Sequence, residues 1–383
     1  KIATICQAVP VDNLLLVCYS LFMKQPHTEM CGLCGELAKA PFRRSKKLVP
    51  KETFFLWLDS LRKKYKLIGP VKVGSQTVFK KLNSSKELFM EYESTMFSPG
   101  KLFIYKPKED LLRFSINDEI AIDEIPPISE KQVIIGVHPC DTNAILYLDK
   151  IFLGAYKDPY YDVRRKNTII ISLNCTKVSL NCFCSSVGAG PFLKAEAGYD
   201  MLLTDFEDKY LIEIKSRRAE ELFNIKGKRV GASELRLKSE KEKSLLSSFK
   251  KTINVEGLDE LFMKNIEHPV WQYTAEERCL SCSNCVMVCP TCFCYDIVDE
   301  TSMDLKTVRR FRHLDACQDI RFAEVYGGNF RQRRAARLRQ FVSHKLNQTS
   351  QYGVLGTVGC GRCITWCPTG IDLTEIAKEI QKS

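Results

Sequence analysis

The sequence lacks the motifs of nucleotide-binding enzymes and of common hydrolases. No Gly-x-Gly-x-x-Gly motif follows a strand-like segment, and "SSVGAGP" has neither the spacing nor the following helix that a dinucleotide pyrophosphate needs. A Walker loop is absent, and no Ser/His/Asp or Cys/His grouping stands out from the background. The sequence therefore shows no substrate site of its own.

Long apolar runs are also absent. The stretch "VDNLLLVCYSLFM" near the start contains Asp12 and Asn13 and has only about a dozen apolar-rich residues, whereas a membrane-spanning helix needs ~20. We therefore expect a buried helix there and no membrane span. We recognise no secretory signal peptide, but the first residue is Lys1 instead of Met, so targeting signals could have been lost with the true N-terminus.

Cysteine is missing from two long stretches and concentrated elsewhere. The chain has 18 cysteines in 383 residues, with none between Phe42 and Pro139 or between Ser185 and Arg278. Ten of them fall at or after Cys279. A disulfide framework suits small secreted domains, and this chain is too long to need such staples. The clustering therefore favours metal sites.

The charge is positive but carries no nucleic-acid signature. The formal net charge is +11, and the densest run is "RQRRAARLRQ" over residues 331–340, which suits a polar-faced helix. This run is compatible with three roles. It could form a solvated helix, bind an acidic partner, or add positive potential beside an anionic group. Because no binding motif accompanies the charge, we do not expect nucleic acid as a partner.

Three segments are predicted along the chain. Residues 1–49 form a leader whose role the sequence does not explain, and its Cys31-x2-Cys34 pair is weak evidence for a cluster. Residues 50–265 form an α/β domain, in which "QVIIGV" (132–137) and "NTIIISLN" (167–174) are buried strands joined by a helix over 141–153. A right-handed parallel crossover is the natural connection between these strands. Residues 266–383 form the third segment, which carries the dense cysteine motifs.

Several further elements follow from local patterns. We predict a helix that starts at Pro50 and ends near Lys66, a strand at "LFIY" (102–105), and a hairpin within 201–214. Charged helical patterns cover residues 239–263, 319–326 and 331–345.

The run "CLSCSNCVMVCP" is the motif of bacterial two-cluster ferredoxins. In those proteins the first three cysteines hold one [4Fe-4S] cluster and the fourth crosses to the other cluster. A second run, "GCGRCITWCP", ends in the same Cys-Pro pair. The expected ligands of cluster one are Cys279, Cys282, Cys285 and Cys367, and those of cluster two include Cys289, Cys360 and Cys363.

This crossover predicts that residues 266–383 are a mainly helical, ferredoxin-like domain with two [4Fe-4S] clusters. Zinc is the competing metal, because Cys-x2-Cys pairs also build zinc sites. A third cysteine at the same spacing, followed by Cys-Pro in both runs, exceeds what one tetrahedral zinc site uses, so iron-sulfur is favoured.

Cluster two lacks a fourth cysteine in this pattern. Thr357 stands where the spacing of the first run would put a cysteine, and a hydroxyl is a poor iron ligand. The fourth ligand could be a thiolate from Cys292, Cys294 or Cys317, or a weak oxygen ligand that leaves one iron exchangeable. The alternative is a [3Fe-4S] cluster with no fourth ligand. The three spare cysteines could equally be small buried apolar residues.

A second cysteine group belongs to the α/β domain. Cys140 follows the first buried strand, Cys175 follows the next, and Cys182 and Cys184 lie in "NCFC". Because the ends of neighbouring parallel strands meet at one edge of a sheet, the four thiols could hold a third [4Fe-4S] cluster there. Structural thiols or a zinc site compete with this interpretation.

Several stretches together resemble one family, the β subunits of cytoplasmic sulfhydrogenases, which are NAD(P)-linked [NiFe]-hydrogenases, and the related iron-sulfur subunits of anaerobic sulfite reductases. The resemblance runs from about Pro50 to the C-terminus. It rests on "GVHPCDTNAILYLDKIFL", "DPYYDVRRKNTIIISLNC", "NCFCSSVGAGP", "CLSCSNCVMVCPTCFCYDIVD", "FAEVYGGNFR" and "GCGRCITWCPTGID".

The resemblance implies a cytoplasmic electron-transfer subunit of a multi-subunit oxidoreductase. Its partners would be a flavin subunit that exchanges electrons with NAD(P)H and a catalytic [NiFe] or sirohaem subunit. "CPTCFC" and "GGNFR" favour the hydrogenase context over the sulfite reductase context. The alternative of a different class is a zinc-stabilised interaction scaffold without redox function.

The family pattern also bears on the ligands. It has a cysteine at the position of Thr357, so this chain departs from it at that corner. The chain matches the family at Cys140, Cys175, Cys182 and Cys184, which favours a third cluster.

Overall fold

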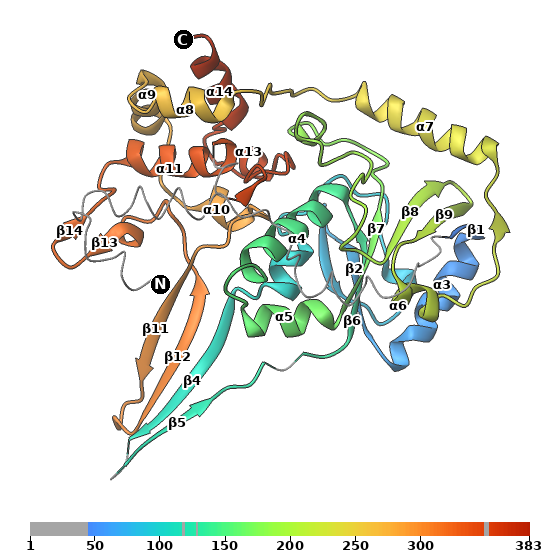
Figure 1. Ribbon diagram of the computed structural model, residues 1–383, viewed down its shortest axis with the longest axis horizontal. Helices are drawn as coiled ribbons and strands as arrows, with labels where there is room; N and C mark the ends of the chain where they lie inside the picture. Colours follow the sequence, from blue (N-terminus) through green and yellow to red (C-terminus); the bar gives the residue numbers. More distant parts are fainter. Residues whose placement is uncertain (1–44, 117–118, 128, 348–351) are drawn as a thin grey trace, which may run out of the picture. The chain divides into compact units, whose positions relative to one another are not determined.

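The computed structural model describes residues 45–116, 119–127, 129–347 and 352–383 (Figure 1). Residues Arg43–Ser383 form one compact unit. The cysteines of the leader, at positions 6, 18, 31 and 34, lie outside the described residues. No helix in the described ranges is long and apolar enough to cross a membrane.

An eight-stranded sheet organises the N-terminal half. Its strand order is β10-β1-β9-β8-β7-β6-β2-β3. The bounds are β1 (Lys46–Pro50), β2 (Lys66–Val73), β3 (Gln76–Lys81), β6 (Gln132–Val137), β7 (Thr168–Leu173), β8 (Met201–Phe206), β9 (Lys209–Ile214) and β10 (Lys228–Arg229). The four central strands β2, β6, β7 and β8 are parallel, and the outer strands pair antiparallel.

The central strands are buried because both faces of a parallel sheet are covered. Every residue of β6 and β7 is buried, as their uninterrupted apolar sequences predict. Helices α4 (Pro139–Phe152) and α5 (Pro159–Lys166) connect these two strands, so the predicted parallel crossover is confirmed. The predicted hairpin is the antiparallel pair β8 and β9.

Strand β1 lies at the end of the segment that we assigned to the leader. Lys46–Pro50 pairs with β9 on one side and with β10 on the other. The sheet of the α/β domain therefore includes residues 46–49 as well as residues beyond 50.

A second sheet joins segments that are distant in the sequence. Strands β4 (Lys108–Ile116) and β5 (Ile120–Glu124) come from the N-terminal half, and β11 (Tyr295–Thr301) and β12 (Thr307–Leu314) come from the C-terminal half. They lie in the antiparallel order β11-β12-β4-β5, with β12 beside β4 (Figure 1). Residues 50–265 and 266–383 thus share one sheet.

Helices and the two cysteine runs share a core in the C-terminal part. The helices are α8 (Leu258–Lys264), α9 (Pro269–Glu277), α10 (Asn284–Val288), α11 (Arg334–Leu346), α13 (Arg362–Thr365) and α14 (Leu373–Gln381). Their apolar side chains bury Cys279, Cys289, Cys292 and Cys317 in one cluster. The part also holds β11, β12 and the short hairpin β13 (Glu324–Val325) and β14 (Gly328–Asn329).

Four local predictions were wrong. The helix after Pro50, α3 (Lys51–Ser60), continues as a 3-10 turn only to Lys63, because β2 begins at Lys66. "LFIY" lies in a π-helical turn (Gly100–Ile104), since a short buried apolar run does not distinguish strand from helix. Residues 319–326 contain a 3-10 turn and β13 instead of a helix. Residues 239–263 fall in two helices, α7 (Ala232–Leu246) and α8, separated by a loop.

Candidate iron-sulfur centres

The two cysteine runs fold as a structural repeat. Ser281 and Ser283 in the first run have φ of 50° and 66°, and Gly359 and Gly361 at the same places in the second run have φ of 62° and 72°. A short helix follows in each run, α10 and α13 respectively, and these two helices pack against each other. The left-handed residues on both sides of the middle cysteine bend the backbone so that successive cysteines face one point.

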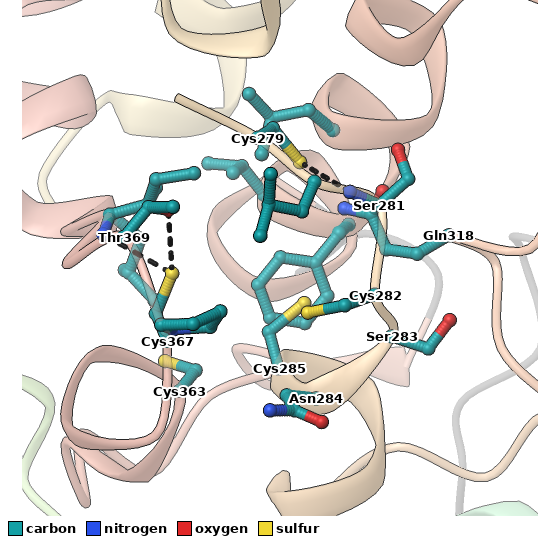
Figure 2. Close-up of a pocket in the computed structure, with 17 residues that line it drawn as sticks. Cys279, Ser281, Cys282, Ser283, Asn284, Cys285, Gln318, Cys363, Cys367 and Thr369 are labelled. Carbon is teal, nitrogen blue, oxygen red and sulfur yellow. Dashed lines mark hydrogen bonds between the residues drawn. The ribbon is translucent and has the colours of Figure 1, made fainter. Parts of the chain in front are cut away.

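The first cavity matches the predicted cluster one. Cys279, Cys282, Cys285 and Cys367 line it, and it encloses about 520 Å³, part of which is open to solvent. Figure 2 shows that these cysteines surround the cavity from two segments of the chain. Cys282 is exposed, so this centre lies close to the protein surface.

Backbone donors face the sulfurs of this first cavity. The Ser281 N–H donates to Cys279 Sγ at 3.4 Å, and the Ile371 N–H donates to Cys367 Sγ at 3.3 Å (Figure 2). The hydroxyl of Thr369 lies 3.4 Å from the same Cys367 sulfur. Hydrogen bonds to sulfur stabilise thiolates and tune the reduction potential of iron-sulfur clusters. The donor set therefore suits a [4Fe-4S] cluster.

The second cavity matches the predicted cluster two. Its lining includes Cys289, Cys360, Cys363 and Thr357. Cys363 lines the first cavity as well, so the two cavities are neighbours. Burial raises the pKa of both Cys360 and Cys363. Without metal these thiols therefore keep their protons, and binding iron would displace them.

Two buried lysines make the second cavity electropositive. Lys345 is 2% exposed, and its ammonium donates to the Thr291 hydroxyl at 3.1 Å. Lys101 is 3% exposed and donates to the carbonyls of Val286 (2.8 Å) and Cys289 (3.1 Å). Burial lowers the pKa of Lys101. Burial acts the same way on Lys345, but the sulfurs of Cys289 and Cys292 outweigh it and raise its pKa.

These cations fit a site that holds thiolates. The pKa of Cys289 is lowered, first by a hydrogen bond with the Cys292 side chain and then by the charges of Lys345 and Lys101, although burial opposes the shift. A buried positive charge offsets the negative charge that three thiolates and bridging sulfides bring into a low-dielectric interior. No motif in the sequence identified either lysine.

The three spare cysteines do not line the second cavity. Cys292 is buried, and its pKa is raised by its hydrogen bond with Cys289 and by burial. Burial also raises the pKa of Cys317 to about 12, and the nearby Cys294 sulfur adds to this shift. Cys292 and Cys317 belong to the apolar core of the C-terminal part.

The third group of cysteines gathers at one edge of the large sheet. Cys140 lies in the first turn of α4, directly after β6, and Cys175 follows β7. A charge on Cys182 would raise the pKa of Cys175, and a charge on either of them would raise that of Cys184, so these thiols lie within electrostatic range of one another. Cys140 packs against the apolar cluster that contains Cys184. The structure thus places the four predicted thiols near one another.

The pKa values of the thiols in this third group are shifted in the same direction as those of Cys360 and Cys363 of the second cavity. Burial raises the pKa of all four thiols, that of Cys182 to about 11. Among the described residues, no three Cys, His, Asp or Glu side chains are arranged to hold a single metal ion. The ligands of a cubane cluster bind different irons and need not converge on one ion.

The third group adjoins the second cavity through direct contacts. Cys182 Sγ lies 3.6 Å from the Cys360 carbonyl, and the Phe183 N–H donates to the Gly359 carbonyl at 2.8 Å. Any Cβ at Gly359 would lie 2.6 Å from the backbone of Cys184. The second cysteine run and the loop of the third group are therefore in contact over their backbones.

A buried ion pair lies at the same junction. Arg362 donates to both carboxylate oxygens of Asp141 at 2.8 Å, and to the Thr95 carbonyl at 2.6 Å. Arg362 stands between Cys360 and Cys363, and Asp141 follows Cys140. No sequence pattern indicates this pair, because its two members are far apart along the chain.

Comparison with known proteins agrees with this site. Residues 278–371 match the family of 4Fe-4S dicluster domains. The chain is 33% identical, over 339 aligned residues, to the sulfhydrogenase 2 subunit beta of Pyrococcus furiosus. The alignment covers 86% of this chain and 97% of that protein. No solved structure matches the chain. With its two cavities lined by the ferredoxin cysteines, the chain belongs to the hydrogenase β-subunit family and is an iron-sulfur electron-transfer subunit with [4Fe-4S] clusters.

Proposed function

We propose that this chain relays electrons between a flavin subunit that reacts with NAD(P)H and a catalytic [NiFe] subunit, in a cytoplasmic complex. The shared wall of the two cavities supports this proposal most directly, because Cys363 lines both of them. When bound, each cluster takes up or releases one electron with little rearrangement. The role of the chain is to hold the clusters close together, with cluster one near the surface where a partner can reach it.

We assign the ligands as the cysteine motifs and cavities suggest. Cluster one is held by Cys279, Cys282, Cys285 and Cys367, and cluster two by Cys289, Cys360, Cys363 and a fourth group. A third [4Fe-4S] cluster is held by Cys140, Cys175, Cys182 and Cys184.

The contacts between the three groups support one order for the relay. Cys360 contacts the third group, and Cys363 faces the first cavity. Cluster two is therefore the middle station. Cluster one is the terminal station at the surface, because Cys282 is exposed.

A hydrogenase context is better supported than a sulfite reductase context. The similar protein from Pyrococcus furiosus is named a sulfhydrogenase subunit. A purified complex with a [NiFe] subunit would agree with this assignment, and one with a sirohaem subunit would overturn it. Co-purification of the tagged chain from its own cells, followed by mass spectrometry of the partners, distinguishes the two.

Metal analysis tests the relay itself. Anaerobically purified chain should contain about twelve irons with matching acid-labile sulfide if it holds three complete cubes, and about eight if it holds two. About one zinc for every four thiols, with no sulfide, would instead support the zinc-stabilised scaffold.

Cys282 offers a direct test of the crossover assignment. The Cys282→Ser variant should lose or alter the EPR signal of cluster one and keep that of cluster two, because its side chain lines only the first cavity. Since Cys282 is exposed, the fold itself should not suffer. Cys294→Ser is the matched control, because Cys294 lines neither cavity. Unchanged cluster-one spectra in Cys282→Ser would contradict the assignment.

A further inference from the structure

Thr357 occupies the place of a thiolate in the structural repeat. In the first run the N–H of Ser281 donates to Cys279 Sγ, two residues earlier, at 3.4 Å. In the second run the N–H of Gly359 donates to Thr357 Oγ1, also two residues earlier, at 3.2 Å. The hydroxyl thus accepts the hydrogen bond that the thiolate accepts in the other run, and Thr357 lines the second cavity.

The backbone beside Thr357 is held in place from two sides. The Thr291 hydroxyl donates to the Gly356 carbonyl at 2.6 Å, and Thr291 in turn accepts from the buried Lys345. A Cβ at Gly356 would lie 2.0 Å from the His344 carbonyl of α11, so the chain passes close to that helix. The threonine side chain is therefore presented to the cavity by a fixed segment.

The spare thiols are placed less favourably for this corner. Cys292 and Cys317 are buried in the apolar core of the C-terminal part, and none of the three spare cysteines lines the second cavity. Thr357 does line this cavity, so its hydroxyl is better placed for the corner.

We propose that the Thr357 hydroxyl takes the fourth corner of cluster two, so that one iron of this cluster has no thiolate ligand and exchanges readily. This inference rests on the proposed function, since it requires a cubane cluster in the second cavity. A neutral alcohol binds iron more weakly than a thiolate, which is the soft ligand that iron-sulfur clusters select. Cluster two, the middle cluster of the proposed relay, is thereby the cluster that loses iron most readily.

The weakly held iron can be released by a one-electron oxidation of the cluster. A one-electron oxidant such as ferricyanide takes a [4Fe-4S]²⁺ cluster to the [4Fe-4S]³⁺ state and becomes ferrocyanide. The oxidised cluster then releases its weakly held iron as Fe²⁺ and leaves a [3Fe-4S]⁺ cluster. Three thiolates remain bound, which Cys289, Cys360 and Cys363 can supply.

The test is ferricyanide titration of the anaerobic protein, followed by EPR spin counting and measurement of released iron. The natural chain should develop about one three-iron signal per chain and release about one iron. Thr357→Cys should suppress both, and Thr357→Ser, which keeps the hydroxyl, should retain both. Thr357→Val removes the hydroxyl at nearly the same volume, so it should lose the iron before any oxidant is added.

Cys292→Ser decides between the hydroxyl and the nearest spare thiol. If Thr357 holds the corner, this variant should behave like the natural chain. If Cys292 is the ligand, the natural chain will give no three-iron signal and only Cys292→Ser will give one, which overturns the inference while the clusters remain. Absence of iron and sulfide from the natural chain would instead overturn the relay proposal.

Discussion

Replacing Arg362 by Met should lower the midpoint of anaerobic thermal unfolding by roughly 5 °C. The replacement leaves Asp141 charged and unpaired in the interior, where the side chains of Arg362 and Asp141 are 2% and 0% exposed. Breaking a buried ion pair from one side typically costs about 3–5 kcal/mol, and in a chain of this size each kcal/mol shifts the midpoint by roughly 1 °C, because the entropy of unfolding grows with chain length. All variants must be scanned at one rate, because loss of clusters makes unfolding irreversible.

A surface arginine that also makes two hydrogen bonds to one carboxylate is the matched control. Arg310 also binds both oxygens of a carboxylate, that of Asp299, at 2.7 Å, but these side chains are 40% and 43% exposed. Arg310→Met should therefore lower the midpoint much less than Arg362→Met does, because water screens an exposed pair. Equal destabilisation by the two arginine replacements would show that burial of the Arg362–Asp141 pair does not increase the cost of losing its arginine.

The double variant Arg362→Met, Asp141→Asn distinguishes two causes of instability: the loss of the ion pair and the unpaired negative charge left on Asp141. It removes the unpaired carboxylate, so it should unfold at a higher temperature than Arg362→Met alone. If the double variant is as unstable as the single one, the cost comes from lost packing around Arg362. The charge on Asp141 would then not be its cause.

Short-range spacing explains why the two ferredoxin cavities could be predicted from the sequence. Ligands two residues apart on a tight turn reach one cluster wherever the turn occurs, so the runs around Cys282 and Cys360 needed no tertiary information. The third group was predictable for a different reason. Cys140 and Cys175 end neighbouring parallel strands, and uninterrupted apolar runs identified those strands.

Long-range contacts were not predictable by the same means. Lys101 and Lys345 look like ordinary surface lysines in the sequence, and only the folded chain brings them to Cys289. The sheet of β4, β5, β11 and β12 pairs distant segments, and the contact between Arg312 and Glu109 joins residues 203 positions apart. Local periodicity carries no information about such partners.

The position of Thr357 lies between these two cases. Alignment of the runs showed that it replaces a cysteine, but the sequence left five options for the corner open. The hydrogen bond from the Gly359 N–H favours the oxygen ligand among these options, because the Thr357 hydroxyl accepts it as the Cys279 sulfur accepts the Ser281 N–H in the first run. A shared backbone conformation therefore carries ligand information that residue types alone do not.

The second large effect should come from Gly361→Ala. Gly361 has φ of 72°, and an added Cβ would lie 2.3 Å from the Asn181 carbonyl oxygen and 2.5 Å from its carbonyl carbon. The left-handed conformation alone costs an alanine about 1–2 kcal/mol, and the overlap with a neighbouring backbone adds about 1–3 kcal/mol. Relief of the overlap must push the second run away from the loop that carries Cys182 and Cys184.

Gly74→Ala isolates the conformational part of this cost. Gly74 has φ of 59° in the turn between β2 and β3, and an added Cβ would meet no atom within 4 Å. Gly74→Ala should therefore lose stability but no iron. Gly361→Ala should lose more stability and also iron from cluster two and the third group, while cluster one, whose cavity Gly361 does not line, keeps its EPR signal. Full iron content in Gly361→Ala would mean that the loop and the second run can separate without loss of iron from either site. The contact between them would then not be needed to hold cluster two or the third cluster.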